Sequence, residues 1–254
     1  MRFCIFGNPV GHSKSPAMFR AAYAAFPELT YDSHEADTAE ECIEILKSRY
    51  DGGNITAPFK EDVFRLADET TETANFIGAV NTVIVSQGKI IADNCDHYGV
   101  SESFGEFNIS LENKSCLLLG VGGAGKAAAY AITKSGGTLT IVNRTVQKAE
   151  TFAEKLNCNA APVADLQNLL KTTDVIINTL YSGIDIVDKD WLNPNQIILD
   201  ASYIGSPLLD KAKKKNCLTI DGRYWVFHQA VYCFSKFTGI QPDTKAMREI
   251  IHLL

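Results

Sequence analysis

The chain has 254 residues, of which 46% are hydrophobic and 21% are charged, so it can bury one large core or two ordinary ones. Its 24 basic residues are outnumbered by 30 acidic ones, and the net charge of -6 argues against nucleic acid or an anionic membrane as a partner. No apolar run reaches the roughly 18 residues that a membrane-spanning helix needs.

Short apolar strands alternate with helical stretches through the first hundred residues. The opening segment 1–10 breaks at Gly7 and Pro9, too early for the core of a signal peptide, and its residues 2–6 predict a first strand. This alternation is typical of parallel sheets covered by helices. The elements expected next are a helix over 15–26, a strand over 29–36, helices over 38–49 and 58–68 with a strand at 52–56 between them, and a hairpin of 79–86 and 89–93 that turns at Gln87-Gly88.

A second series of elements begins after residue 100. A strand at 116–120 leads through a glycine-rich turn into an alanine-rich helix, and further strands are expected at 139–143, 174–178, 196–200 and 217–220. Residues 224–252 predict two helices, the second beginning at Pro242. We therefore expect a two-domain α/β protein with a cleft between its domains, one formed by 1–100 with the C-terminal helices 222–254, and a Rossmann domain formed by 101–221.

The sequence GVGGAG, from Gly120 to Gly125, matches the pattern GxGxxG and lies between a predicted strand and a predicted helix. The first glycine permits the tight turn, the second lets backbone N–H groups approach a pyrophosphate, and the helix N-terminus favours the negative charge. This context favours a dinucleotide site over a plain glycine-rich turn. The expected contacts are Gly120, Gly122, Gly123, Ala124 and Gly125.

The next predicted strand ends in Asn143-Arg144-Thr145, with Lys148 one turn later. NAD-binding proteins usually carry an acidic residue here, which accepts a hydrogen bond from the ribose 2′-hydroxyl and would repel a 2′-phosphate. A guanidinium binds that phosphate through two hydrogen bonds. The sequence therefore predicts NADP rather than NAD, and Asn143 or Thr145 is also expected to cap the helix that follows.

Two polar turns in the first half gather groups suited to a small polar ligand. Ser13 and Ser15 follow the first strand, where hydroxyls and helix-start amides can hold a carboxylate, although simple helix capping is the alternative. Asn54, Thr56 and Lys60 follow the third strand, where the alternative is a solvated turn with a helix beginning at Pro58.

Six motifs, taken in chain order, resemble those of the shikimate dehydrogenase family: GNPVGHSKSP (7–16), NITAPFK (54–60), GAVNT (78–82), DNCDHYG (93–99), GVGGAG and NRT. The resemblance covers nearly the whole chain. It implies an N-terminal substrate domain, a Rossmann domain for NADP, and C-terminal helices that pack on the first domain. It also implies the reversible reduction of 3-dehydroshikimate to shikimate, a step of aromatic amino-acid biosynthesis.

The resemblance also implies roles for individual residues. Lys60 is similar to the catalytic lysine of the family and Asp96 to its carboxylate partner. A lysine beside an aspartate can supply or take the proton of the reacting oxygen while stabilising its charge. The residues that resemble substrate-binding groups are Ser13, Ser15, Thr56, Asn81, Asp96, Tyr203 and Gln229, and Gly222 is expected near the cofactor, whereas Asn54 is expected to shape its turn.

Three later segments depart from the family pattern, namely 178–184, 200–209 and 221–229. Trp225 stands where the family usually has a methionine near the nicotinamide, so it either reshapes that pocket or packs inside the fold. A paralogue acting on quinate or another hydroxy acid therefore remains an alternative. A non-catalytic sensor of nucleotide or shikimate is a further alternative, but sensing would not require both Lys60 and Asp96.

The seven cysteines are scattered, odd in number and without metal-like spacing. Such cysteines are typical of small buried hydrophobic residues in a reducing compartment, which predicts a cytoplasmic protein without a disulfide framework or a metal site. Beyond its small-molecule substrate we expect no nucleic-acid or membrane partner, and either a monomer or a homodimer.

Overall fold

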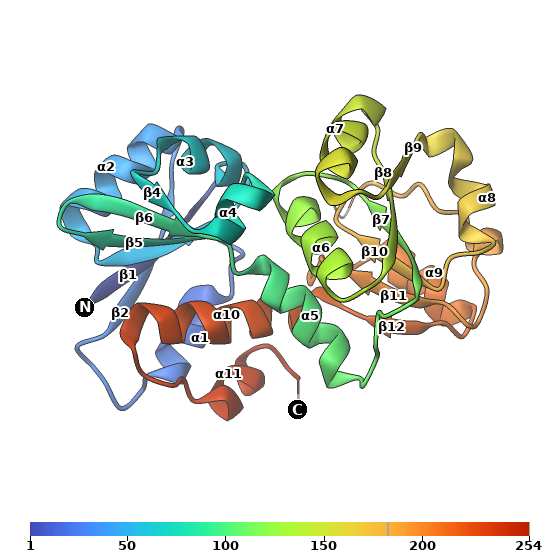
Figure 1. The fold of residues 1–254 in the computed structure, drawn as a ribbon. Coiled ribbons are helices and arrows are strands. Elements are labelled where there is room, and N and C mark those ends of the chain that lie inside the picture. Colours follow the sequence, from blue (N-terminus) through green and yellow to red (C-terminus); the bar gives the residue numbers. More distant parts are fainter. Residues whose placement is uncertain (182, 254) are drawn as a thin grey trace. The chain divides into compact units, whose positions relative to one another are not determined.

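A computed structural model of the chain describes residues 1–181 and 183–253 (Figure 1). The chain forms two compact units: the first contains Met1–Tyr98 and Phe227–Leu254, and the second contains Gly99–Val226. Within the residues described, no helix combines the length and the apolar character needed to cross a membrane.

The first unit is built on a six-stranded sheet with the order β2-β1-β3-β5-β6-β4. Its β1 pairs in parallel with β2 and β3, but β5 runs antiparallel to both β3 and β6, so the sheet is mixed rather than parallel. The predicted hairpin is confirmed, because Gln87 and Gly88 both have positive φ angles, of 51° and 74°, as a two-residue hairpin turn requires. The elements are β1 (Arg2–Gly7), α1 (Ser15–Ala22), β2 (Thr30–Glu35), α2 (Ala39–Arg49), β3 (Gly52–Ile55), α3 (Lys60–Leu66), β4 (Glu69–Thr70), α4 (Glu72–Ile77), β5 (Thr82–Ser86) and β6 (Lys89–Asp93).

Helices cover both faces of this sheet. Figure 1 shows α2 and α3 on one face and α1, α10 (Gly222–Thr238) and α11 (Thr244–Ile250) on the other. The C-terminal segment is attached to α1, since the Asp243 N–H donates to the Ala22 carbonyl (3.1 Å) and the Tyr23 hydroxyl donates to the Ile240 carbonyl (2.9 Å). Phe234 of α10 packs edge-on against Phe19 of α1, with ring centroids 5.0 Å apart. Buried aromatic contacts of this kind stabilise the attachment beyond the area they bury.

The second unit is a six-stranded parallel sheet with the order β12-β11-β10-β7-β8-β9. The strand order reverses between β7 and β10, and ligands of such sheets bind at the carboxyl ends of the strands near that reversal. The elements are α5 (Asp96–Glu106), which begins in the first unit, β7 (Ser115–Leu119), α6 (Gly123–Lys134), β8 (Thr138–Val142), α7 (Val146–Leu156), β9 (Asn159–Ala161), α8 (Leu166–Leu170), β10 (Val175–Asn178), β11 (Ile197–Asp200), α9 (Pro207–Lys214) and β12 (Leu218–Ile220).

Alternate residues of the second sheet enter two different cores. Leu118 of β7 packs with α5 and α6, whereas its neighbour Leu117 packs with α8 and α9. The same alternation follows Ile177 and Ile176 on β10. Successive side chains of a strand point to opposite faces, so these apolar strands require helices on both sides.

Several element boundaries differ from the predicted ones. Helix α1 ends at Ala22 rather than at 26, α3 begins at Lys60 rather than at Pro58, and α11 begins at Thr244 behind Asp243, whose carboxylate accepts the Ala246 N–H. Several elements were not predicted, among them β4, α4, α5 and β9. Two of these are strands of two or three residues, and α5 contains two glycines, so its helix depends on packing rather than on local propensity.

Candidate active site

Lys60 and Asp96 meet in the first unit. Each is the first residue of a helix, α3 and α5 respectively, and Lys60 Nζ lies 2.5 Å from Asp96 Oδ2. Only 14% of the lysine side chain and 5% of the aspartate side chain are exposed. The N-terminus of α5 stabilises the negative charge of Asp96, and the low exposure strengthens its attraction to the ammonium.

A tight turn holds Asp96 in place. Asn94, which is fully buried, accepts the Asp96 N–H through its side-chain oxygen (3.0 Å) and donates its amide to the Ala79 carbonyl (2.9 Å). The N–H of Cys95 donates to the side-chain oxygen of Asn81 at 2.7 Å. Backbone and side-chain groups of the turn are thus both satisfied, which fixes the direction of the Asp96 carboxylate.

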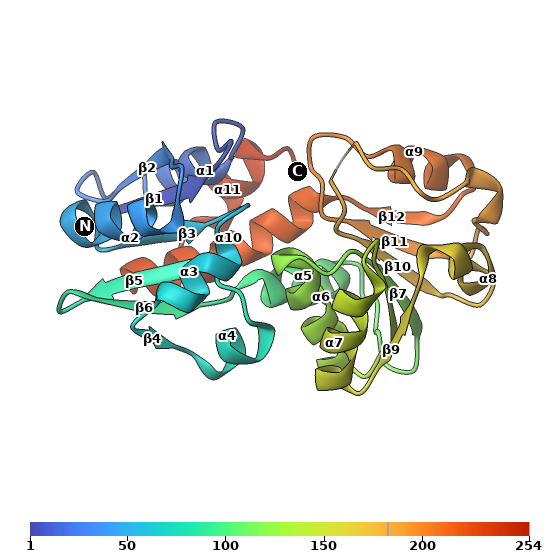
Figure 2. The ribbon, with the colours of Figure 1, turned by 90° about the horizontal axis from the view of Figure 1, so that it is seen from above.

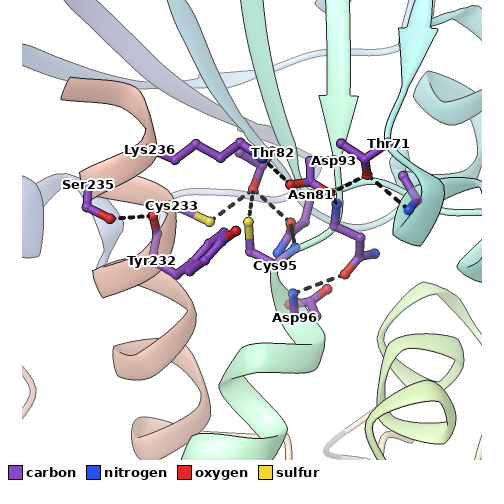
Figure 3. Close-up of polar contacts among 12 residues, drawn as sticks. Thr71, Asn81, Thr82, Asp93, Cys95, Asp96, Tyr232, Cys233, Ser235 and Lys236 are labelled. Atoms are coloured by element: carbon purple, nitrogen blue, oxygen red, sulfur yellow. Dashed lines mark hydrogen bonds and ion pairs between the residues drawn. The ribbon is translucent and has the colours of Figure 1, made fainter. Parts of the chain in front are cut away.

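Asn81 connects three distant segments. Its Nδ2 donates to Gln229 Oε1 of α10 at 2.8 Å, and its own carbonyl accepts the Asn54 side-chain amide at 2.9 Å. Thr82 beside it donates its hydroxyl to Asn81 Oδ1 at 2.9 Å (Figure 3). Asn81 and Gln229 are therefore brought together with the turn of Asp96, and Asn54 supports this arrangement from β3.

Ser13 lies in the turn before α1 and Ser15 is the first residue of that helix, but neither caps it. The N-cap position belongs to Lys14 and has no side-chain cap, so the predicted capping alternative was wrong. Ser13 Oγ accepts the Ser15 N–H at 3.3 Å, and the buried Ser15 hydroxyl is hydrogen-bonded to Tyr31. Tyr31 in turn donates to Asn54 Oδ1 at 2.7 Å.

Tyr31 is thus a residue of this network that the motifs did not reveal. The periodicity of β2 carries a weak signal, because Tyr31 is the buried position in a strand whose other residues are exposed or half-exposed. Thr56 lies half-buried where β3 ends, and a Cβ on Gly7 would collide with its methyl group. The chain therefore passes close to itself where β1 and β3 end, at the carboxyl edge of these two strands.

The glycines of the second unit's GxGxxG turn have three different environments. Gly120 has a φ of +93°, which favours glycine, and a Cβ on Gly125 would collide with the Gly120 carbonyl, so α6 packs tightly on its turn. In contrast, a Cβ on Gly122 would meet nothing within 4 Å. The fold thus explains Gly120 and Gly125, whereas Gly122 borders open space at the start of α6, where a phosphate can approach the backbone.

Arg144 and Lys148 are both exposed beside this turn, Arg144 directly after β8 and Lys148 on the first turn of α7. Thr145 occupies the N-cap position of α7 without a side-chain cap bond, and Asn143 instead donates its amide to the Thr145 carbonyl at 2.9 Å. The predicted cap by either side chain was therefore wrong. Two exposed cations next to the glycine turn fit the 2′-phosphate of NADP.

One of the divergent segments, the loop after β11, is anchored by a buried carboxylate. Asp200 is buried and accepts the side chains of Ser206 (2.5 Å) and Asn178 (2.8 Å), which holds the loop after β11. Tyr203 in that loop is half-buried, and burial raises the pKa of its hydroxyl. A Cβ on Gly222 would collide with the Ala201 carbonyl. Ser182, in the divergent 178–184 stretch, lies outside the described residues.

Trp225 is a core residue of the second unit. It is only 4% exposed, and a Cβ on Gly99 would lie 2.5 Å from its indole ring. The packing alternative therefore accounts for this tryptophan. The seven cysteines are free thiols. Burial raises the pKa of Cys42 and of Cys116 to about 12, so these two thiols remain protonated near pH 7.

Two family models match the chain: the shikimate dehydrogenase substrate binding domain over residues 5–83, and shikimate / quinate 5-dehydrogenase over 102–203. Shikimate dehydrogenase (NADP(+)) of Pyrococcus furiosus is 32% identical, over 97% of this chain and 93% of its own length. The structure of shikimate 5-dehydrogenase from Thermus thermophilus in complex with NADP(H) and shikimate is similar, with a TM-score of 0.90, 27% identity and coverage of 100% and 99%.

Quinate dehydrogenase from Corynebacterium glutamicum in complex with NAD is also similar, with a TM-score of 0.89, 27% identity and coverage of 100% and 99%. These relatives confirm the predicted α/β class, with a substrate domain followed by a Rossmann domain. With the full-length identity to curated relatives, they establish that the chain belongs to the shikimate dehydrogenase family.

Proposed function

We propose that this protein is an NADP-dependent shikimate dehydrogenase that reversibly reduces 3-dehydroshikimate to shikimate, a step of aromatic amino-acid biosynthesis. The observation that carries the proposal is the nearly buried contact between Lys60 and Asp96, 2.5 Å long, next to the Asn81–Gln229 hydrogen bond. We assign the substrate and the proton transfer to the first unit and NADP to the second.

Reduction of a ketone needs a hydride at carbon and a proton at oxygen, and NADPH supplies the hydride when it is bound. The Lys60 ammonium is the proton donor for the developing alkoxide, and it stabilises the negative charge as that charge forms. Asp96 orients the ammonium through their hydrogen bond. In the reverse direction, the same lysine in its neutral form accepts the proton of the substrate hydroxyl.

A polyhydroxylated acid needs a hydrogen-bonding partner for each of its polar groups. Thr56, Asn81, Asp96 and Gln229 are assigned to the ring oxygens. Ser13 and Ser15 are assigned to the carboxylate, and the hydrogen bond with Tyr31 keeps the Ser15 side chain in place. Tyr203 is proposed as a substrate-binding residue on the resemblance alone.

The assignment of NADP follows from the residues around the glycine turn. Gly122 leaves room for the pyrophosphate, whereas Arg144 and Lys148 offer positive charge to the 2′-phosphate. The relatives from Pyrococcus and Thermus are named or crystallised with NADP, which supports the same choice. The proposed contacts are Gly120, Gly122, Gly123, Ala124, Gly125, Asn143, Arg144, Thr145, Lys148 and Gly222.

A dehydrogenase acting on quinate is the second candidate. One related structure is a quinate dehydrogenase in complex with NAD, and the divergent segments 178–184 and 200–209 of this chain lie at the carboxyl ends of β10 and β11. A non-catalytic sensor is disfavoured, because a sensor has no need of an ion pair that can transfer a proton.

Steady-state turnover should be measured with shikimate and with quinate, each with NADP and with NAD. The proposal predicts the highest kcat/KM for shikimate with NADP. Preference for quinate, or for NAD, would establish the second candidate instead, and absence of turnover with every pair would favour the sensor.

A further inference from the structure

A second lysine–carboxylate pair lies close along the chain to the first. Lys236 of α10 forms an ion pair with Asp93, the last residue of β6, three positions before Asp96 (Figure 3). The Asp93 side chain is only 12% exposed. The negative charge of a carboxylate this deeply buried must be balanced by a nearby positive charge. The ion pair with Lys236 therefore matters more to the fold than an exposed surface pair would.

Asp93 also anchors the turn that carries Asp96. Its Oδ1 accepts the Thr71 hydroxyl at 2.5 Å and the Asn94 N–H at 2.8 Å, while its Oδ2 accepts Lys236. Asn94 then accepts the Asp96 N–H. A short chain of hydrogen bonds therefore runs from the Lys236 ammonium to the backbone of Asp96.

Lys236 also continues a stripe of contacts along α10. Gln229, Cys233 and Lys236 follow one another at spacings of four and three, which places them on one face of the helix. Gln229 contacts Asn81 and Cys233 contacts the Thr82 hydroxyl at 2.9 Å. Figures 1 and 2 show α10 lying along the sheet that contains β5 and β6.

The strand partners of this stripe are themselves neighbours, because Thr82 pairs with Asp93 in the β5–β6 hairpin. The ion pair is thus the third contact in a series that begins at Gln229, a proposed substrate ligand. With contacts at both ends of the series, α10 is held against sliding along its own axis as well as against moving away from the sheet.

The charges around the turn are balanced as two pairs, Lys60 with Asp96 and Lys236 with Asp93. Burial lowers the pKa of His97 and raises that of Cys95, and a hydrogen bond with Tyr98 together with burial raises that of Tyr232, so these groups are neutral near pH 7. Cys233 of α10 contacts Thr82 of β5 and, in the turn itself, Cys95. Loss of either member of the second pair would therefore leave an unbalanced charge beside the first.

We propose that Lys236 is a positioning residue for the Lys60–Asp96 pair: it neutralises Asp93, supports the turn that carries Asp96, and holds α10 with Gln229 in register. The catalytic meaning of this role rests on the proposed function. The electrostatic part concerns the folded protein alone and can be tested without turnover.

The test compares Lys236→Met, Asp93→Asn, the double variant and Lys236→Arg. Lys236→Met leaves the negative charge of Asp93 unbalanced, and this charge makes the Lys60–Asp96 pair hold its protons more tightly. The acidic limb of the pH profile of kcat/KM for shikimate oxidation should therefore move up by about half a pH unit. Asp93→Asn leaves the positive charge of Lys236 and should move that limb down by a similar amount. The double variant and Lys236→Arg should both lie close to the wild type.

Both single variants break the same ion pair, so a purely structural role predicts the same effect for both. Opposite shifts in pH dependence therefore indicate an electrostatic effect on the Lys60–Asp96 pair. Shifts in one common direction, or no shift in either, would overturn the proposal. The pH midpoint of Lys60 should also be measured by competitive labelling with acetic anhydride and peptide mass spectrometry, and the same opposite shifts are expected. If the wild type shows no dehydrogenase activity, the proposed function fails while the labelling still decides this inference.

Discussion

The side chains of Asn81 and Gln229 are separated by 148 residues in the chain and joined by a hydrogen bond of 2.8 Å. Asn81 precedes β5, and Gln229 lies on the helix that brings the C-terminal segment into the first unit. The proposed substrate surface is therefore complete only when α10 is present. A truncation before α10 would remove one of its ligands and expose the aromatic core that Phe234 fills.

Gln229→Ala should raise the KM for shikimate by about ten-fold or more, with a smaller change in kcat. The substitution removes one substrate contact and leaves the Asn81 amide without its partner, a loss of about 1–3 kcal/mol. Steady-state kinetics measures the split between the two constants. The exposed Gln167→Ala on α8 serves as the matched control. An unchanged KM in Gln229→Ala would remove Gln229 from the substrate site.

Lys60→Ala should lower kcat by roughly 10²–10⁴-fold while leaving substrate affinity within a modest factor. The proton moves chiefly in the transition state, whereas the bound substrate in its ground state is held by hydroxyl and amide side chains other than Lys60. Stopped-flow turnover and equilibrium binding of shikimate measure the two effects separately.

Asp96→Asn should also slow turnover, and the double variant should be little worse than the worse single one, because the two side chains act as a unit. Losses that simply add would mean that the two residues act independently. A fully active Lys60→Ala protein would rule out the proposed proton transfer.

Arg144→Ala should weaken NADP binding by about 10–100-fold and NAD binding far less, because a charged hydrogen bond to phosphate is worth about 1.5–3 kcal/mol. Asn143→Asp should change the preference in the same direction through repulsion of the 2′-phosphate. Calorimetric titration with both nucleotides measures the difference. Equal weakening of the two would contradict the assignment of Arg144.

The motifs predicted the contact between Lys60 and Asp96, but not the residues that support it. Lys60 and Asp96 could be paired from the resemblance, and the glycine turn from its position between a strand and a helix. Lys236 could not be found in this way, because hydrogen bonds between distant side chains leave no periodic trace in the sequence. Tyr31 had only the weak signal of its place in β2. The antiparallel course of β5 beside β3 was missed for a similar reason, since a hairpin signal fixes one pairing of a strand and not the other.

Trp225 is the converse case: the motif comparison singled it out, but the structure gives it a packing role. Comparison with the family pattern singled it out as a possible pocket residue, but pattern alone does not say which face of a helix is buried. Its ring lies against Gly99, where no side chain intervenes. A change in a motif can therefore reflect packing within the fold rather than a change in the ligand.

Two glycines of one turn offer a matched pair for testing which of them serves the fold and which serves the cofactor. Gly125→Ala should lower the free energy of unfolding by about 1–3 kcal/mol, because the new Cβ would collide with the Gly120 carbonyl. Gly122→Ala should cost less than about 1 kcal/mol, because its Cβ meets nothing within 4 Å and its φ of -74° suits alanine.

For nucleotide binding the order should be reversed: among folded molecules, Gly122→Ala should lose more NADP affinity than Gly125→Ala. At a temperature where both remain folded, Gly122→Ala should weaken NADP binding more than ten-fold, because the added methyl group occupies space that the pyrophosphate needs. Denaturant unfolding and calorimetric titration of both variants measure the two quantities side by side. Unimpaired NADP binding by Gly122→Ala would mean that the open space beside Gly122 is not the pyrophosphate site.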